Sequence, residues 1–221
     1  MSRIVLKVGG AVAGEAATLA LALAERHEVC VVHGAGPQIS AELERAGLEV
    51  RFVDGRRVTS AEALNVVRGS FAAVNADVCA AIGPRAVPLF GDDIGLQAVR
   101  IRELGHVGSP LPSSPAAIEA ALEAGLVPVV APLGVGPLNV NADEAAAALA
   151  LGLGADKLLF LTDVPGLLLG GVVASRIAVA EAERLLAAGV FGGGIVPKLA
   201  AAVTAARGGV DATIGATAVV A

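Results

Sequence analysis

The chain has no tryptophan and no tyrosine, and five phenylalanines are its only aromatic residues. Proteins that hold single-stranded nucleic acid usually stack the bases on aromatic side chains, so this composition argues against that function. The formal net charge of −5 also gives no reason to expect a nucleic-acid or membrane partner. An anionic substrate would therefore have to be held by local positive charge, against the average field of the protein.

Cysteine is also scarce, because only Cys30 and Cys79 occur, far apart and among apolar neighbours. No Cys-x-x-Cys pair and no metal-ligand spacing is present, so we expect two packed free thiols in a cytoplasmic protein. The first apolar run begins at Ile4, which leaves no room for a signal peptide. The longest uncharged stretch, 124–142, contains three prolines and three glycines, so no membrane helix is expected there.

Lysine is the rare cation, with three residues against thirteen arginines. Lys7 and Lys198 both stand in glycine-rich segments, Lys7-Val8-Gly9-Gly10 and Gly192-Gly193-Gly194-Ile195-Val196-Pro197-Lys198, whereas Lys157 is expected to face solvent. A glycine turn lets backbone N–H groups approach an anion, and lysine adds a compact point charge on a flexible stem. The pattern predicts an enzyme that handles phosphoryl groups.

Short apolar runs alternate with alanine-rich amphipathic segments along the chain. This alternation predicts an α/β fold whose mostly parallel sheet is covered on both faces and binds ligands at the carboxyl ends of its strands. The predicted strands are Ile4–Val8, Val29–Val32, Val87–Phe90, Val127–Ala131, Lys157–Thr162 and Ala212–Ile214, with a hairpin of Gln97–Ile101 and Glu103–Val107. The predicted helices are Glu15–Arg26, Gln38–Ala46, Ser60–Ala80, Ala116–Ala124, Asp143–Leu151, Val179–Ala188 and Lys198–Arg207.

The segment His33-Gly34-Ala35-Gly36-Pro37 follows the second predicted strand. It offers Gly-x-Gly, but Ile39 stands where a dinucleotide fold needs its third glycine, so the NAD fingerprint is incomplete. The segment is either a plain turn with Pro37 at the first helical position or an anion site formed by free N–H groups. His33 taken alone is more typical of a structural histidine than of a catalytic one.

Two further polar segments also have both structural and functional interpretations. Arg56 and Arg57 form either a solvated surface pair or a clamp for a substrate carboxylate, with Thr59 or Ser60 capping the next helix. In Asn139-Val140-Asn141-Ala142-Asp143-Glu144, Asn141 and Glu144 fit a capping box, which leaves Asn139 unexplained. Asp143 either favours the positive end of the helix or holds the two lysines in place.

These segments together narrow the chemistry. No Ser-His-Asp triad in a recognisable context, no metal-ligand cluster and no Walker A sequence is present. A carboxylate nucleophile would need none of them, because its pKa of about 4.3 keeps it ionised at neutral pH. Phosphoryl transfer to a carboxylate needs alignment and charge neutralisation, which two lysines, glycine-loop N–H groups and Mg²⁺ would supply.

Six segments in order resemble the acetylglutamate kinases of the amino acid kinase family, and together they cover nearly the whole chain. They are Lys7-Val8-Gly9-Gly10, His33-Gly34-Ala35-Gly36-Pro37, Phe52-Val53-Asp54-Gly55-Arg56-Arg57-Val58-Thr59, Asn139-Val140-Asn141-Ala142-Asp143, Leu161-Thr162-Asp163-Val164-Pro165-Gly166 and Gly193-Gly194-Ile195-Val196-Pro197-Lys198.

The resemblance implies ATP-dependent phosphorylation of the side-chain carboxylate of N-acetyl-L-glutamate, the second step of arginine biosynthesis. It implies one domain, an α/β/α sandwich, with a lobe of about 1–142 for the acyl amino acid and a lobe of about 143–221 for ATP. By the same resemblance, Lys7 and Lys198 would stabilise the transferring phosphoryl group and Asp143 would orient both. Arg57 would clamp the α-carboxylate, with Asn139 and the Gly34-Ala35 backbone nearby.

The nucleotide contacts implied by the resemblance lie in three loops. Mg²⁺ would be held mainly by the nucleotide phosphates, with no dedicated protein metal site. The residues expected to contact ATP are Gly9, Gly10, Asp163, Val164, Pro165, Gly166, Leu167, Leu168, Val190, Phe191, Gly192, Gly193 and Gly194.

Three departures from the family pattern bear on these expectations. The family usually has glycine where Ala35 stands, which puts amino-acid affinity or acyl specificity in question. The segment after Arg207 is short, which suggests that one helix of the nucleotide lobe is missing. Only Met1-Ser2-Arg3 precede the first strand, whereas arginine-inhibited hexamers carry an N-terminal helix, so a homodimer without arginine feedback is expected.

Two alternatives remain open on the sequence. One is a kinase for a related acyl amino acid, such as an aminoadipate derivative, although Arg57 within Gly-x-Arg-x-Thr favours acetylglutamate. The other is a non-catalytic ligand sensor on the same fold, which Ala35 and the short end suggest and the two lysines and Asp143 argue against.

Overall fold

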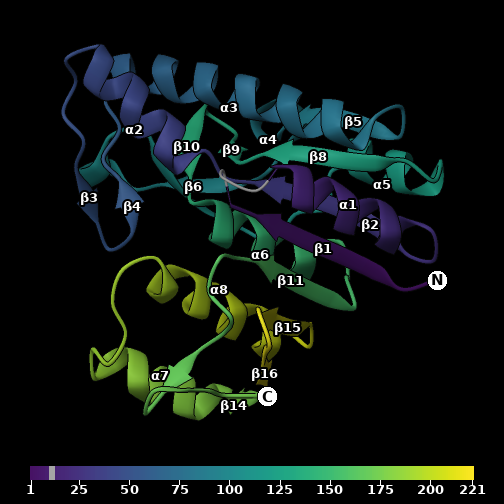
Figure 1. The fold of residues 1–221 in the computed structure, drawn as a ribbon. Coiled ribbons are helices and arrows are strands. Elements are labelled where there is room, and N and C mark those ends of the chain that lie inside the picture. Colours follow the sequence, from purple (N-terminus) through teal and green to yellow (C-terminus); the bar gives the residue numbers. More distant parts are fainter. Residues whose placement is uncertain (10–12) are drawn as a thin grey trace.

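A computed structural model describes residues 1–9 and 13–221 and contains a central sheet of eight strands (Figure 1). All neighbouring strands are parallel except β15 and β16, which form an antiparallel pair. In sheet order the strands are β14 (Arg176–Ala178), β16 (Thr217–Val220), β15 (Asp211–Ile214), β11 (Lys157–Leu161), β1 (Arg3–Val8), β2 (Glu28–His33), β8 (Val127–Ala131) and β5 (Ala86–Phe90). All six predicted strands are confirmed as members of this sheet.

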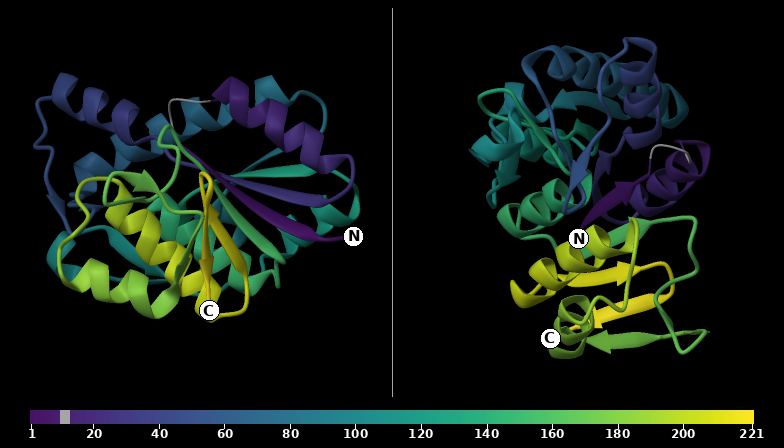
Figure 2. Two further views of the ribbon diagram at one scale, coloured as in Figure 1. Left: turned by 60° about the horizontal axis from the view of Figure 1, so that its bottom comes forward. Right: turned by 90° about the vertical axis from the view of Figure 1, so that its left-hand side faces the viewer.

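Helices cover both faces of the sheet and make a three-layer α/β/α sandwich (Figures 1 and 2). Alternation along β1 explains this, because Val5 belongs to one buried cluster while Leu6 and Val8 belong to the other. One face packs against α1 (Ala13–Ala24), α2 (Gly36–Arg45) and α3 (Ala61–Ile82), and the other against α5 (Ala116–Glu123), α6 (Ala142–Gly152), α7 (Val179–Ala187) and α8 (Ile195–Arg207). The predicted fold class is confirmed.

The cysteine prediction is confirmed for Cys30 and only partly for Cys79. Both thiols are free, but Cys30 is fully buried whereas Cys79 is half-buried. Burial raises the pKa of Cys30 to about 12, so this side chain packs as a neutral apolar group. Lys157 is exposed, as expected.

A smaller sheet consists of β6 (Ala98–Arg100), β7 (Val107–Pro110), β10 (Leu138–Val140) and β9 (Leu133–Gly134), beside the short helix α4 (Gly91–Ile94). The predicted hairpin exists, but its second strand is wrong: Arg102–Leu104 is a 3₁₀ turn, and β7 starts at Val107. Gly105, with φ +84°, allows the sharp reversal that delays the strand.

Two small hairpins were not predicted. β3 (Phe52–Val53) pairs with β4 (Arg56–Arg57), and β12 (Leu168–Leu169) pairs with β13 (Val172–Val173). Asp54 and Gly55 both have positive φ, of 48° and 75°, which is the type I′ turn that an Asp-Gly pair favours between two strands.

Helix α8 begins at Ile195, three residues before the predicted start. Lys198 therefore lies in the first helical turn and not in the glycine turn that precedes it. Pro197 does not stop the helix earlier, because the first-turn N–H groups have no intrahelical partner to lose.

The parallel register brings the glycine loops together. Lys7 stands opposite Val32 of β2 and Phe160 of β11, so the loops after these three central strands leave the sheet at one edge. Across residues 1–9 and 13–221, no helix has both the length and the apolar character needed to cross a membrane.

Candidate active site

Two lysines share one carboxylate at the carboxyl ends of the central strands. Asp143 Oδ1 lies 2.8 Å from Lys7 Nζ and 3.1 Å from Lys198 Nζ. Lys7 comes from β1, Asp143 from the first turn of α6 and Lys198 from the first turn of α8. All three are buried, with exposed fractions of 6–8%. The structure thus brings together side chains that are distant in the sequence.

The cluster carries more positive than negative charge. Burial lowers the pKa of Lys198, and the neighbouring Lys7 lowers it further, whereas Asp143 opposes the shift. Lys198 Nζ also lies 5.6 Å from the centre of the Phe160 ring. Two buried ammonium groups on one carboxylate leave a positive charge that a bound anion would neutralise.

Asp143 is held in place by the cap of its helix. Asn141 Oδ1 accepts hydrogen bonds from the backbone N–H groups of Asp143 and Glu144, at 2.8 and 3.3 Å. Asn141 is therefore the N-cap, as predicted. The predicted capping box is wrong for Glu144, because its carboxylate pairs with Arg56 and not with the backbone of the cap residue.

Arg57 is 6% exposed, which excludes its interpretation as a solvated surface residue. Its Nη2 donates to Gly36 O at 3.0 Å and to Ser40 Oγ at 2.9 Å, and its guanidinium lies 4.5 Å from the centre of the Phe52 ring. Within the described residues its buried Nη1 has no hydrogen-bond acceptor. Burial lowers the pKa of Arg57, and a buried cation with a free donor suits a carboxylate.

Asn139 and Thr59 connect β10 with β4. Asn139 Nδ2 donates to Thr59 Oγ1 at 3.0 Å, and Thr59 Oγ1 donates to Arg57 O at 2.7 Å. Ser60 is the cap of α3, because its Oγ accepts from Ala63 N. The side chain of Asn139 is thereby fixed at the wall of the cavity beside the backbone of Arg57.

His33 has a structural environment. It is fully buried, its Nε2 accepts from Asn75 Nδ2 at 3.1 Å, and it makes an edge contact with Phe71. Burial lowers its pKa to about 4, so the ring is neutral near pH 7. Ala35 is 1% exposed and has a negative φ of −143°, so its methyl packs in the core without backbone strain.

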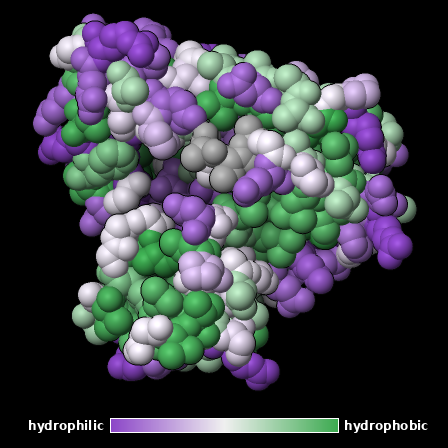
Figure 3. Space-filling view, viewed as in Figure 1, coloured by the Kyte–Doolittle hydropathy of each residue, from purple (hydrophilic) through white to green (hydrophobic). Residues whose placement is uncertain are grey.

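The lysine cluster, Arg57 and Asn139 lie on the wall of a cavity of about 800 Å³. Figure 3 shows the hollow on this face of the molecule, with hydrophilic side chains around it. The predicted catalytic and binding residues that line it are Lys7, Gly9, Gly34, Ala35, Arg57, Asn139, Asp143, Asp163, Val164, Pro165, Gly166, Leu168, Phe191, Gly192, Gly194 and Lys198.

Four of the expected contacts are not placed on this cavity. Leu167 is fully buried, and its N–H donates to Thr217 Oγ1. Val190 and Gly193 lie outside the lining, and Gly10 lies outside the described residues. Much of the apolar wall consists of residues that had not been predicted for the site, namely Phe52, Ile39, Phe71 and Val107. The Asp-Gly turn could have revealed Phe52, since the hairpin places it opposite Arg57.

Known proteins resemble this chain over almost its full length. A model of the amino acid kinase family matches residues 2–215. The acetylglutamate kinase of Rubrobacter xylanophilus is 43% identical over 224 residues, which cover 97% of this chain and 88% of the relative. That of Methanopyrus kandleri is 41% identical over 226 residues, covering 93% and 91%.

A solved structure shows the same architecture. The crystal structure of smu.665 from Streptococcus mutans UA159 superposes with a TM-score of 0.89 at 27% identity, covering 99% of this chain and 98% of that one. The family model, the sequence relatives and the superposition all extend over both the lysine cluster and the cavity. This chain therefore belongs to the amino acid kinase family.

Proposed function

We propose that this protein transfers the γ-phosphoryl group of ATP to the side-chain carboxylate of N-acetyl-L-glutamate, the second step of arginine biosynthesis. The observation that carries the proposal is the pair of buried ammonium groups on Asp143, which face the same cavity as the free donor of Arg57. Acetylglutamate kinases 38–43% identical to this chain give independent support.

The reaction needs charge neutralisation more than proton transfer. A carboxylate oxygen forms a bond to the γ-phosphorus, and the bond from that phosphorus to the β–γ bridging oxygen breaks, so that an acyl phosphate and ADP result. No proton moves, because the nucleophile is already ionised. Lys7 and Lys198 neutralise charge on the phosphoryl oxygens, and Asp143 fixes both ammonium groups before the substrates arrive.

The amino acid is held in the lobe of about 1–142. Arg57 binds its α-carboxylate through the free Nη1, Asn139 and the Gly34-Ala35 backbone lie alongside, and the apolar side chains of the wall face the acyl group. The α-carboxylate would supply the acceptor that Arg57 lacks within the described residues. This arrangement favours an acyl amino acid over a free one, because a charged α-amino group would lie near the apolar wall.

The nucleotide is held in the lobe of about 143–221. The walls of its site would be the segment from Asp163 to Gly166, Leu168, Phe191, Gly192 and Gly194, all of which line the cavity. Nucleotide contacts from Gly10, Leu167, Val190 and Gly193 stay predictions as well. Among the described cavity residues, Asp163 is the carboxylate outside the lysine cluster, and it is exposed. A single carboxylate is consistent with Mg²⁺ that binds as a complex with the nucleotide. The ion would partly neutralise the charge of the nucleotide phosphates.

The same proposal includes the state of the protein in solution. We expect a cytoplasmic homodimer that arginine does not inhibit. Light scattering that gives twice the chain mass of 21.7 kDa, and unchanged turnover in millimolar arginine, are the expected results. A hexamer, or inhibition by arginine, would contradict this part without affecting the reaction.

The reaction is tested by trapping its product. Purified protein, ATP and Mg²⁺ are mixed with N-acetyl-L-glutamate and hydroxylamine, which converts an acyl phosphate into a hydroxamate that is measured as its coloured iron(III) complex. We expect equal amounts of hydroxamate and ADP, and much less with free glutamate or N-acetyl-L-aminoadipate. A preference for the aminoadipate derivative would replace acetylglutamate as the proposed substrate. Ligand binding measured by calorimetry, without any turnover, would identify the protein as a sensor.

A further inference from the structure

The β3–β4 hairpin carries two consecutive arginines with different partners. Both arginines line the cavity, but Arg56 also forms a two-bond ion pair with Glu144: Nη2 lies 3.0 Å from Oε1, and Nε lies 3.3 Å from Oε2. The two side chains are half-buried, with exposed fractions of 29% and 21%. Burial raises the pKa of Glu144, and Arg56 opposes this by stabilising the ionised carboxylate.

Two further contacts hold the tip of the hairpin. Asn141 Nδ2 donates to Gly55 O at 3.1 Å. A Cβ atom on Gly55 would lie 3.3 Å from Cβ and Cγ of Pro197, so the turn rests directly on the residue before Lys198. The tip of the hairpin therefore contacts the start of both helices that supply the lysine cluster.

The hairpin has little to stabilise it by itself. Each of its strands has two residues, and Phe52 and Val53 are 53% and 37% exposed. Isolated hairpins are marginal even when they are longer, so the orientation of Arg57 depends on how the hairpin is docked. The ion pair joins the residue next to Arg57 to the residue next to Asp143, and it is the charged part of that docking.

We propose that Arg56 and Glu144 are positioning residues that dock the hairpin on α6 and thereby hold Arg57 in place for the acyl amino acid. The inference rests on the proposed function, since it assigns the carboxylate of that substrate to Arg57. In this role Arg56, which also lines the cavity, and Glu144, which does not, act through Arg57 and not through contact with the substrate. Because the docking acts on binding in the ground state and the transition state alike, it sets the KM for the amino acid more than kcat.

A double-mutant cycle tests the proposal. Arg56→Gln and Glu144→Gln are each expected to raise the KM for N-acetyl-L-glutamate about fivefold, which matches a partly exposed pair worth about 1 kcal/mol. The double variant should show the same rise of about fivefold, whereas independent effects would multiply to about 25-fold. The KM for ATP and kcat should stay within about twofold of the unsubstituted protein, and Arg56→Lys should keep part of the affinity.

Arg3→Gln is the matched control, because Arg3 is another partly exposed arginine paired with glutamate but lies at the other end of β1. It should lower the melting temperature and leave the amino-acid KM unchanged. An unchanged KM in Arg56→Gln, multiplicative effects in the double variant, or a loss of stability alone would overturn the positioning role. If the unsubstituted protein itself shows no hydroxamate, the proposed function fails and this role fails with it.

Discussion

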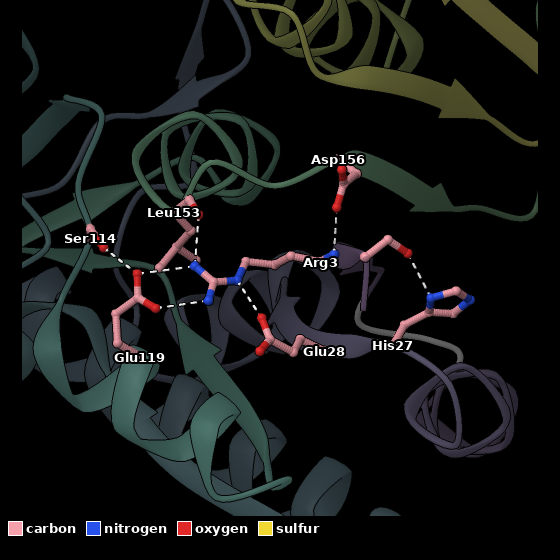
Figure 4. A network of polar contacts seen from close by, with 8 residues as sticks. Arg3, His27, Glu28, Ser114, Glu119, Leu153 and Asp156 are labelled. Atoms are coloured by element: carbon pink, nitrogen blue, oxygen red, sulfur yellow. Dashed lines mark hydrogen bonds and ion pairs between the residues drawn. The ribbon is translucent and has the colours of Figure 1, made fainter.

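The two ends of strand β1 contain charged clusters of opposite balance. At the amino end, Arg3 pairs with Glu28 at 2.8 Å and Glu119 at 2.9 Å, and it donates to Leu153 O at 2.7 Å (Figure 4). The backbone N–H of Arg3 donates to Asp156 Oδ2 as well. The guanidinium thus pairs with two carboxylates, a third carboxylate accepts from the backbone of the same residue, and no positive charge is left for a ligand.

At the carboxyl end the balance is reversed. Lys7 and Lys198 share one carboxylate, and the nearby Arg57 keeps one N–H without an acceptor among the described residues. Burial makes each unbalanced charge costly, and an anion bound between these groups would relieve that cost. Charge balance, more than the mere presence of ion pairs, therefore separates the structural network at one end of β1 from the candidate binding site at the other.

The largest expected effect is on catalysis at the carboxyl end. Lys198→Met should lower kcat by roughly 10²-fold or more, because one preorganised donor to the phosphoryl group is lost. The free energy of unfolding should stay the same or rise, since a buried, repelled charge is removed. ADP release and thermal unfolding measure the two quantities. A variant that is less stable but equally active would make this cluster structural, like the one around Arg3.

The next effect is on substrate affinity. Arg57→Ala should raise the KM for N-acetyl-L-glutamate by about 10- to 100-fold, because hydrogen bonds between charged groups are worth about 1.5–3 kcal/mol. kcat at saturation should change much less if Arg57 binds ground and transition states alike. Initial rates over a range of amino-acid concentrations give both values. An unchanged KM would move the carboxylate site elsewhere in the cavity.

A smaller effect concerns acid stability at the carboxyl end of β2, where His33 is buried. Its pKa is about 4 in the folded protein because of burial, and about 6.5 when unfolded, so the unfolded state binds more protons in between. The free energy of unfolding should therefore fall as the pH drops from about 6.5 to about 4. His33 alone should account for a loss of about 1 kcal/mol between pH 6 and pH 5. Urea unfolding at both pH values should show a shallower dependence in His33→Gln. Equal slopes would mean that His33 is not buried as a neutral ring.

The smallest effect is expected at the amino end. Arg3→Gln should lower the free energy of unfolding by about 1 kcal/mol, because its ion pairs are partly exposed, and the melting temperature by about 2–4 °C. Its kcat and both KM values should remain within about twofold of the unsubstituted protein. A clear loss of activity at unchanged stability would remove the distinction between the two ends of β1.

The sequence predicted most of the central sheet well and one of its two edges poorly. Continuous apolar runs identify β1, β2 and β11 because both faces of these strands are buried. The edge strand β14 and its neighbour β16 are short and had not been predicted. The start of α8 was misplaced because glycines and Pro197 obscure where the first turn begins.

The lysine cluster could be anticipated from rare lysines next to glycines, while the partner of Arg56 could not. Local rules assign Glu144 to a capping box three residues from Asn141, since they see only neighbours in sequence. The tertiary ion pair with Arg56, 88 residues away, competes with that bond and prevails. The free Nη1 of Arg57 is likewise a property of packing, which no sequence pattern encodes.

The position of the transferring phosphoryl group is the most direct test of the account. Crystals grown with N-acetyl-L-glutamate, MgADP and aluminium fluoride would hold a planar analogue of that group. We expect the fluoride to lie about 3 Å from both Lys7 Nζ and Lys198 Nζ, with the substrate carboxylate and ADP on opposite sides. Fluoride bound away from either ammonium group, with both lysines still held on Asp143 alone, would contradict the central claim.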